Sequence, residues 1–152
     1  MPFDKDKKTY YLTLPMPPSV NAAYQPVYRK GGFAGKGHSD TIKTQEYKEW
    51  EVVDASASFR RQFPGGTPKV LEGRLQVQYT YHFTSAHGGD IFNREKVLSD
   101  FLEKKFFKND SQIDVGVVRR RVRRDIVKSY VEIWITEIED HRFDDMFGKG
   151  GY

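Results

Sequence analysis

The stretch DIFNREKVLSDFLEKKFFKNDSQID, residues 90–114, decides how the rest of the chain is arranged. It opens on Asp90, directly after two glycines, and it reaches a second acidic turn at Asp110 before a run that is typical of a strand. The segment between the two carboxylates has the periodicity of an amphipathic helix. We expect this helix to pack back on a sheet, so that the carboxylates meet near Lys96. Such a group would hold a divalent cation beside a phosphate.

The helix within this stretch is predicted to carry a polar stripe beside an apolar face, at roughly 100° per residue. The stripe consists of Asn93, Lys96, Asp100 and Lys104. The apolar face consists of Val97, Leu98, Phe101 and Leu102. We expect Asn93 or Asp90 to cap the first turn, because both side chains accept hydrogen bonds from free helix N–H groups. Asp90 would then lie at the positive end of the helix, where a phosphate is favoured. The same pattern also fits a surface helix with solvated charges.

Alternating residues predict the rest of an α+β domain. Strand-like patterns occur at residues 9–14, 74–83, 112–123 and 127–138, and the last two are expected to pair as a hairpin. His82 falls on the polar face of its strand, and we expect it at the surface. Residues 44–62 have helical spacing and end at the PGGTP turn. The order βαβαββ predicts a mixed sheet with helices packed on it.

Residues 25–40, QPVYRKGGFAGKGHSD, are rich in glycine and basic groups, and we expect a mobile loop. They do not match a phosphate-binding P-loop, because Lys30 stands where the first glycine is needed and Gly37 replaces the Ser or Thr that binds magnesium. Contact with nucleic acid and a plain surface loop both remain open for this segment.

Composition limits the class of protein. The 152 residues, 38% hydrophobic and 30% charged, are expected to form one domain over residues 1–140, followed by a disordered tail over residues 141–152. The chain has no cysteine, which excludes disulfides and thiolate metal sites. No run approaches the ~20 apolar residues of a membrane span, and the N-terminus lacks the apolar core of a signal peptide. We therefore expect a cytoplasmic protein.

The net charge is only +4, but the cations are concentrated at one place. Five arginines lie within six positions: Arg119, Arg120, Arg121, Arg123 and Arg124. A local cluster on a nearly balanced chain indicates a patch that binds a polyanion such as DNA. On a strand, residues 119, 121 and 123 share one face, and residues 120 and 124 the other. Arginines on an edge strand also protect against aggregation, so a solubility role remains open.

The residues that could carry chemistry are carboxylates, a lysine and these arginines. The four histidines show no metal-ligand spacing, and no nucleophile elbow is present. A site made only of oxygen ligands favours Mg²⁺ or Mn²⁺ over zinc. Such a metal acts on phosphates by activating water and neutralising the charge that builds at phosphorus.

The order of the motifs resembles the RusA family of Holliday junction resolvases, over roughly residues 10–138. The family's opening signature, Pro-Pro-Ser-x-Asn after a strand, is matched by PPSVN at residues 17–21. Its core signature, Asp-x-Asp-Asn-x-x-Lys, is matched by Asp90, Asn93 and Lys96. The helical Asp-x-Leu is matched at residues 100–102, and the acidic turn with its isoleucine at residues 109–113.

The resemblance implies a RusA-like fold and a homodimeric, magnesium-dependent endonuclease that cuts four-way DNA junctions in recombination and repair. Two nicks need two active sites, which suits a dimer. The carry-over makes Asp90 and Asp110 metal ligands, with Asn109 as a neutral oxygen ligand, and it makes Lys96 the group that stabilises the phosphate. Asn93 and Asp100 are expected to support the site. Family members often come from bacteria and their phages, which predicts the cytoplasm of a bacterial or phage-infected cell.

Two departures from the family pattern leave an alternative function open. Phe92 stands where the family has its second Asp, and Asn109 replaces the first acid of the later pair. Losing a carboxylate lowers metal affinity, although Mg²⁺ usually keeps several waters. Asp100 and Asp114 are candidate substitutes. The leading prediction is an active but altered endonuclease, and the runner-up is a dimer that binds branched DNA with weak cleavage or none. An unrelated α+β protein with coincidental motifs is the third reading.

Overall fold

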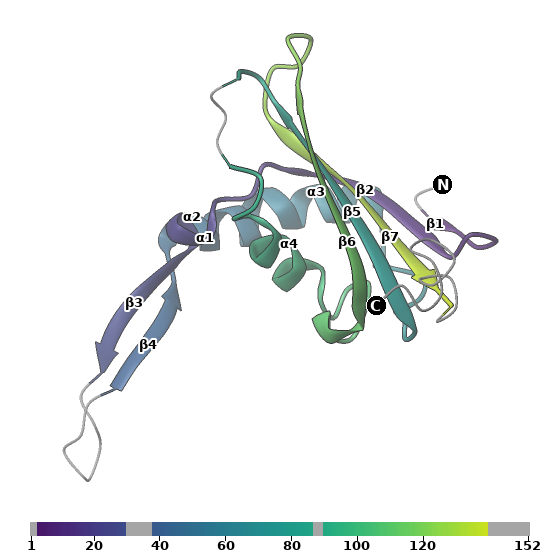
Figure 1. Cartoon of the computed structure of the whole chain (residues 1–152), viewed down its shortest axis with the longest axis horizontal. Coiled ribbons are helices and arrows are strands. Elements are labelled where there is room, and N and C mark those ends of the chain that lie inside the picture. Colours follow the sequence, from purple (N-terminus) through teal and green to yellow (C-terminus); the bar gives the residue numbers. More distant parts are fainter. Residues whose placement is uncertain (1–2, 30–37, 87–89, 140–152) are drawn as a thin grey trace, which may run out of the picture.

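The computed structural model describes residues 3–29, 38–86 and 90–139, and its centre is a five-stranded sheet (Figure 1). The strands lie in the order β1 (Phe3–Asp4), β2 (Thr9–Pro15), β7 (Tyr130–Ile138), β5 (Arg74–Phe83) and β6 (Ile113–Val122). Neighbours run antiparallel, except for β5 and β6, which are parallel. The predicted α+β class with a mixed sheet is confirmed. The predicted tail at residues 141–152 lies outside the described residues.

The crossover from β5 to β6 decides the strand order. The chain leaves β5, passes through α4 (Glu95–Leu102) and the 3₁₀ turn η2 (Asp110–Gln112), and returns as β6. Parallel neighbours need a crossover of this kind. Because β6 occupies one side of β5, β7 takes the other side and also pairs with β2. The prediction that the last two strands form a hairpin pair is therefore wrong.

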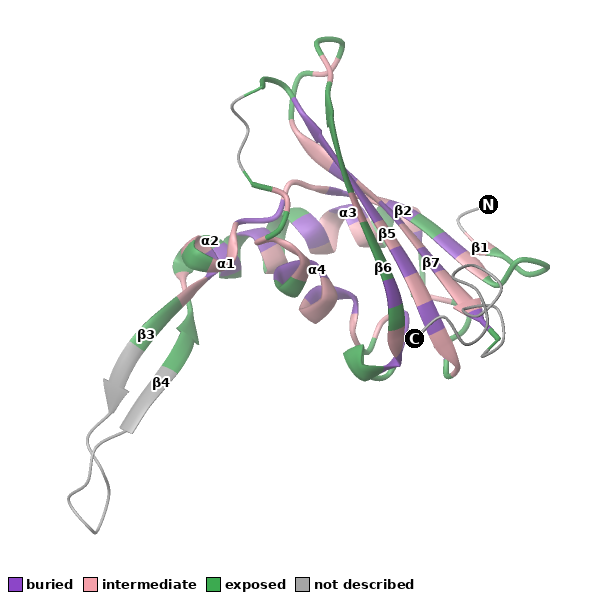
Figure 2. Ribbon diagram, in the orientation of Figure 1, coloured by how far each residue is buried: buried purple, intermediate pink, exposed green. Residues whose placement is uncertain are grey.

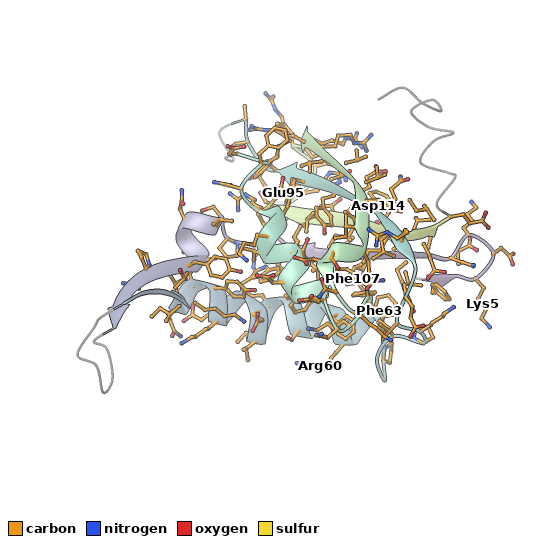
Figure 3. All side chains as sticks on the ribbon, turned by 60° about the horizontal axis from the view of Figure 1, so that its bottom comes forward. Lys5, Arg60, Phe63, Glu95, Phe107 and Asp114 are labelled. Carbon is orange, nitrogen blue, oxygen red and sulfur yellow. The ribbon has the colours of Figure 1, made fainter. Side chains whose placement is uncertain are left out.

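Helices cover one face of the sheet (Figure 1). The segments α2 (Gln45–Glu49), η1 (Trp50–Ala55, a π-helix) and α3 (Ser56–Gln62) follow one another, which confirms the helix predicted over residues 44–62. The predicted apolar face of α4 is buried, since none of its four residues is more than 1% exposed. Phe63 and Phe107 belong to the same core (Figure 3). No helix within the described ranges is long and apolar enough to cross a membrane.

A second, two-stranded sheet corrects the prediction of a mobile loop at residues 25–40. After the short helix α1 (Val20–Ala23), β3 (Tyr24–Arg29) pairs antiparallel with β4 (His38–Lys43). The residues between them lie outside the described part of the chain. The glycines are confined to the middle of this segment. The flanking runs, QPVYR and HSDTIK, contain β-branched and aromatic residues, which is typical of the two strands of a hairpin. The hairpin projects away from the five-stranded sheet (Figure 1).

In the described part of the chain, no helix covers the other face of the sheet, here called the open face (Figures 1 and 2). His82 points to this face, but it is 0% exposed, so the prediction of a surface histidine is wrong. Its ring stacks on Tyr130 at 4.5 Å, and its Nε2 contacts one carboxylate oxygen of Glu132. The other oxygen of Glu132 accepts a hydrogen bond from the Tyr11 hydroxyl at 2.7 Å. Large cross-strand neighbours therefore bury a polar residue without any helix above it.

Candidate functional site

The loop before α4 presents Asp90 at the surface in a turn of its own. The side-chain Oδ1 of Asp90 accepts a hydrogen bond from the backbone N–H of Phe92 at 2.8 Å, and the carboxylate is exposed. The helix α4 begins at Glu95, so its N-cap residue is Arg94, whose side chain makes no capping hydrogen bond. The prediction that Asn93 or Asp90 caps α4 is therefore wrong. The Oδ1 atom of Asn93 is instead buried without a hydrogen-bond partner.

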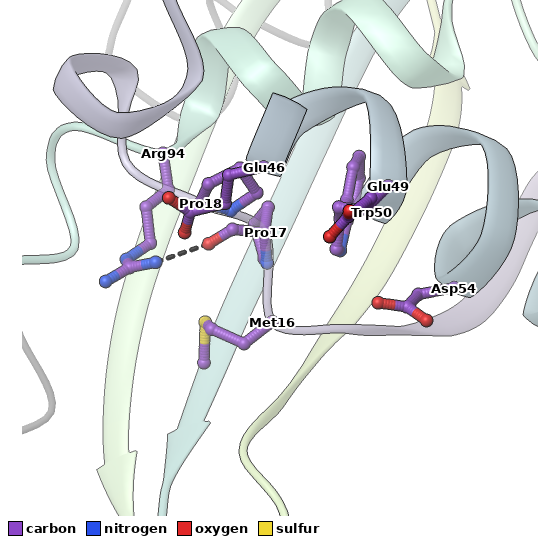
Figure 4. A pocket seen from close by; sticks show the side chains of 8 residues that line it. All are labelled: Met16, Pro17, Pro18, Glu46, Glu49, Trp50, Asp54 and Arg94. Carbon is purple, nitrogen blue, oxygen red and sulfur yellow. Dashed lines mark hydrogen bonds between the residues drawn. The ribbon is translucent and has the colours of Figure 1, made fainter. Parts of the chain in front are cut away.

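Arg94, which the sequence analysis missed, joins this loop to the PPSVN turn. Its Nε donates to the backbone carbonyl of Asp90 at 3.3 Å, and its NH1 donates to the backbone carbonyl of Pro17 (Figure 4). The guanidinium also lies 5.8 Å from the ring centroid of Phe83. Burial lowers the pKa of Arg94, while nearby acidic groups act in the opposite direction. The two family motifs, far apart in sequence, are thus held together by one side chain.

A backbone hydrogen bond makes the same connection. The N–H of Val20 donates to the carbonyl of Asn93 at 2.7 Å, so the PPSVN turn and the start of α4 share a main-chain contact. Ser19 caps α1 by accepting from Ala22 N–H, which fixes the direction in which the turn leaves. The signature serine, Ser19, therefore shapes the turn that supports the Asp90 loop.

Lys96, in the first turn of α4, lies in a small network with Asp100 and Tyr24. Its Nζ is 3.6 Å from the Oδ2 of Asp100, one helical turn later, and 5.3 Å from the ring centroid of Tyr24. The Tyr24 hydroxyl donates to the same Oδ2. Burial raises the pKa of Tyr24, and the Asp100 carboxylate raises it further. Asp100, predicted to support the site, thus lies beside Lys96, and Tyr24 of β3 joins them; the role of Asp100 in the site stays a prediction.

The acidic turn is anchored at the opposite end of α4. Asn109 caps η2, accepting from Ser111 N–H at 2.8 Å, and Gln112 completes the capping box. The backbone N–H of Asp110 donates to the Oε1 of Glu103, the residue that ends α4, at 3.3 Å, and the Asp110 carboxylate is exposed. The amide oxygen of Asn109 is thus already used in local structure.

The structure does not bring Asp90 and Asp110 into contact within one chain. Asp90 is tied to Arg94 at the start of α4, and Asp110 to Glu103 at its end. A helix of 8 residues is about 12 Å long. No hydrogen bond or ion pair joins Asp90, Lys96 and Asp110, and the described ranges contain no group of three His, Cys, Asp or Glu residues that could hold a metal ion. The shared ion therefore stays a prediction.

The candidate substitute Asp114 is occupied elsewhere. Both of its carboxylate oxygens accept hydrogen bonds from Arg74, one of them at 2.9 Å from Nε. This hydrogen bonding lowers the pKa of Asp114. The Phe92 side chain, at the position of the family's second Asp, is 75% exposed and supplies no oxygen.

The arginine cluster divides between two faces of the sheet. Arg120 lies on the helix side, where it donates to the carbonyl of Ala86 and approaches the ring centroid of Phe83 at 5.0 Å. The register with β5 places Arg119 and Arg121 on the open face. Arg123 is paired with Asp125, and its NH1 donates to the Tyr130 hydroxyl at 2.8 Å. Arg124 is exposed.

A cavity of about 270 Å³ opens beside Arg94, between the PPSVN turn and the α2–η1 helix (Figure 4). Its apolar part comes from Met16, Pro17 and Trp50, and the Trp50 indole donates to the Pro15 carbonyl at 3.0 Å. Three carboxylates line it: Glu46, Glu49 and Asp54. Arg94 is the cation among the lining residues, and the three carboxylates make the cavity unfavourable for a phosphate unless a metal ion is bound.

The family described as Endodeoxyribonuclease RusA matches residues 15–135, which include the PPSVN turn, both acidic motifs and the arginine cluster. No match was found among the curated proteins. The resemblance to the RusA family of Holliday junction resolvases is confirmed, and the chain belongs to the RusA endodeoxyribonuclease family.

Proposed function

We propose that the protein is a structure-selective endonuclease that nicks four-way DNA junctions by metal-dependent hydrolysis, in the cytoplasm of a bacterial or phage-infected cell. The observation that carries the proposal is the exposed Asp90 carboxylate, on a loop whose backbone carbonyl at Asp90 is joined by Arg94 to the PPSVN turn, with Lys96 in the adjoining helical turn. A carboxylate repels DNA phosphates unless a metal ion intervenes. Acid and cations at one helix start therefore suit phosphodiester chemistry better than binding alone.

The carboxylate oxygens of Asp90 are suitable ligands for a hard cation such as Mg²⁺ or Mn²⁺. Asp90 is exposed, and Phe92 N–H occupies only one of its oxygens. Mg²⁺ is usually bound through one or two carboxylates plus substrate phosphate and keeps several waters. When bound, the ion would supply an activated water and neutralise charge at phosphorus. The Lys96 ammonium would bind a phosphate oxygen, with Asp100 and Tyr24 fixing its position.

The separation of the two acidic motifs supports the proposal of a homodimer. Asp90 and Asp110 contact opposite ends of α4, whereas ligands of one Mg²⁺ lie at 2.0–2.1 Å from it. We propose that the Asp110 of each site comes from the partner subunit. The test mixes Asp90→Asn and Asp110→Asn protein, each inactive alone. Half of the dimers are then mixed, and each has one intact site of two, so nicking returns to about a quarter of the wild-type rate. No recovery would place both carboxylates of a site in one chain.

The proposal itself is tested by nicking of a synthetic four-way junction, with a linear duplex of the same sequence as the control substrate. Wild type is expected to nick the junction with Mg²⁺ or Mn²⁺, and Asp90→Asn to lose about a hundredfold or more in rate. Both proteins should bind the junction, which separates catalysis from binding. A wild type that cleaves both substrates equally, or neither, would contradict the proposal.

The exposed Phe92 favours the runner-up, a junction-binding dimer with weak cleavage or none. The same assay distinguishes the two functions. If wild type binds the junction without nicking it, and Phe92→Asp gains metal-dependent nicking, then the natural site is inert and the runner-up is correct.

A further inference from the structure

The edge strand β6 places its arginines on two faces with different surroundings. Pairing with β5 sets Arg119 beside Thr80 and Arg121 beside His82, both on the open face, and both arginines are exposed. Arg120 points to the helix side, near the loop that leads to Asp90. The cluster therefore cannot contact DNA as one patch. Arg119 and Arg121 face away from the candidate nicking site and need a different ligand.

Beside these two arginines, aromatic rings occupy the centre of the open face, next to the paired carboxylate of Glu132. Trp134 of β7 stands between Tyr11 of β2 and Gln78 of β5. The ring centroids of Tyr11 and Trp134 are 5.2 Å apart, Tyr11 is 38% exposed, and Trp134 is partly exposed. Val117 on β6 continues the surface and is also 38% exposed. Rings on a sheet face, next to cations on one edge, are suited to act as a stacking platform.

The carboxylates on this half of the open face are already engaged. Glu132 accepts from Tyr11 and contacts His82. Burial alone would raise the pKa of Glu132, but the hydrogen bonds with Tyr11 and His82, together with the nearby charges of His82 and Arg121, outweigh it and lower the pKa. Asp114 is bound by Arg74. Among the described residues, both of these carboxylates are thus already paired and would compete poorly for the Arg119 and Arg121 of a second copy, which favours a polyanion as the ligand.

The distribution of charge also distinguishes single strands from duplex. A duplex hides its base faces in the stack and is held mainly through phosphates, which needs cations across the whole contact. Here the cations follow one strand, while the neighbouring strands offer rings, amides and hydroxyls. Single strands expose base faces to aromatic side chains while their backbone follows a cationic edge.

We propose that the open face binds a segment of single-stranded DNA, with its phosphates along Arg119 and Arg121 and its bases stacked on Trp134 and Tyr11. A flap or fork would supply such a strand to an endonuclease, so the inference extends the proposed function. It does not depend on the metal site, because binding is measured without cleavage.

Trp134 supplies its own probe. The chain has two tryptophans, and Trp50 is only 4% exposed. The full-length protein, without divalent metal, is titrated with oligothymidine of about ten nucleotides, within the range that one binding platform covers. Tryptophan fluorescence should be quenched. In Trp134→Thr the quenching should disappear and affinity should fall about tenfold, the effect of one stacked base.

The salt dependence tests the arginines. Arg119→Gln with Arg121→Gln should lower the slope of log affinity against log salt by about 1.4, because each lost contact to a single strand contributes roughly 0.7. The matched control is Arg60→Gln with Arg61→Gln at the end of α3, which removes the same charge far from the open face (Figure 3). It should leave affinity and slope unchanged, and an equal effect of the two pairs would overturn the proposal.

Three further results would overturn it: unchanged fluorescence on adding oligothymidine, equal affinity for a duplex of the same length, or conversion of dimer to monomer by Trp134→Thr in sedimentation. The last would assign the open face to contact between copies. Circular dichroism of each variant checks that it is folded. Asp90→Asn should still bind oligothymidine, so failure of the nicking proposal and failure of this one give different results.

Discussion

Replacement of Arg94 by glutamine should loosen both family motifs at once. The arginine donates to the carbonyls of Asp90 and Pro17, half-buried beside the ring of Phe83. Hydrogen bonds from a charged donor contribute about 1.5–3 kcal/mol each. Two such bonds set an upper range of about 3–6 kcal/mol, and partial exposure to water reduces it. We expect Arg94→Gln to lower the free energy of unfolding by about 2–3 kcal/mol.

The assay is urea denaturation followed by circular dichroism, which gives the free energy of unfolding. Thermal unfolding of the same variant should show a fall in Tm of about 4–12 °C for a domain of this size. Arg60→Gln is the matched control, since Arg60 is exposed on α3 and its loss should change stability by less than about 0.5 kcal/mol. Junction nicking by Arg94→Gln should also slow, with binding less affected, because the Asp90 loop loses its anchor. If Arg94→Gln unfolds at the same urea concentration as wild type, then Arg94 does not hold the two motifs together.

Three other predictions concern single contacts. Hydrogen bonds hold the pKa of Glu132 below its ordinary value. The contribution of Glu132 to stability is therefore present above its unfolded-state pKa and is lost as the pH falls through its folded-state pKa. In Glu132→Gln, the fall in Tm between about pH 5 and pH 3 should be smaller than in wild type. Tyr24→Phe removes the hydrogen bond to Asp100 and should cost about 1 kcal/mol in urea unfolding, while raising the KM for junction DNA; an unchanged KM would separate Tyr24 from Lys96. Gln112→Leu should lower the free energy of unfolding by about 3 kcal/mol, because the buried amide donates to the carbonyls of Leu71 and Gly73 and accepts from two backbone N–H groups. A decrease below about 1 kcal/mol would show that water takes over these hydrogen bonds.

Local sequence patterns were sufficient to predict strands and the buried face of a helix. Alternation identified β2, β5 and β6, because period two exposes every second side chain to the same face. Helical spacing identified the buried face of α4. The same patterns were misleading where packing between strands decides the outcome. Burial of His82 depends on Tyr130, Glu132 and Tyr11, which lie on strands distant in sequence.

The helix cap failed for a related reason. Asp90 and Asn93 have the right chemistry for a cap, but Asp90 closes its own turn, and the loop conformation is set by Arg94 reaching across to Pro17. Arg94 carried no signal in the sequence, because its role is to join two segments whose proximity appears only in the folded chain.

The sequence by itself determined the class of fold, the family, and the residue types that phosphate chemistry needs, because these depend on local spacing and on the chemistry of each side chain. Tertiary structure alone decided the strand order, the division of the arginines between two faces, and the placement of Asp90 and Asp110 at opposite ends of α4. Those features depend on the direction in which the β5–α4–β6 crossover carries the chain, and residues far apart in sequence determine that direction together.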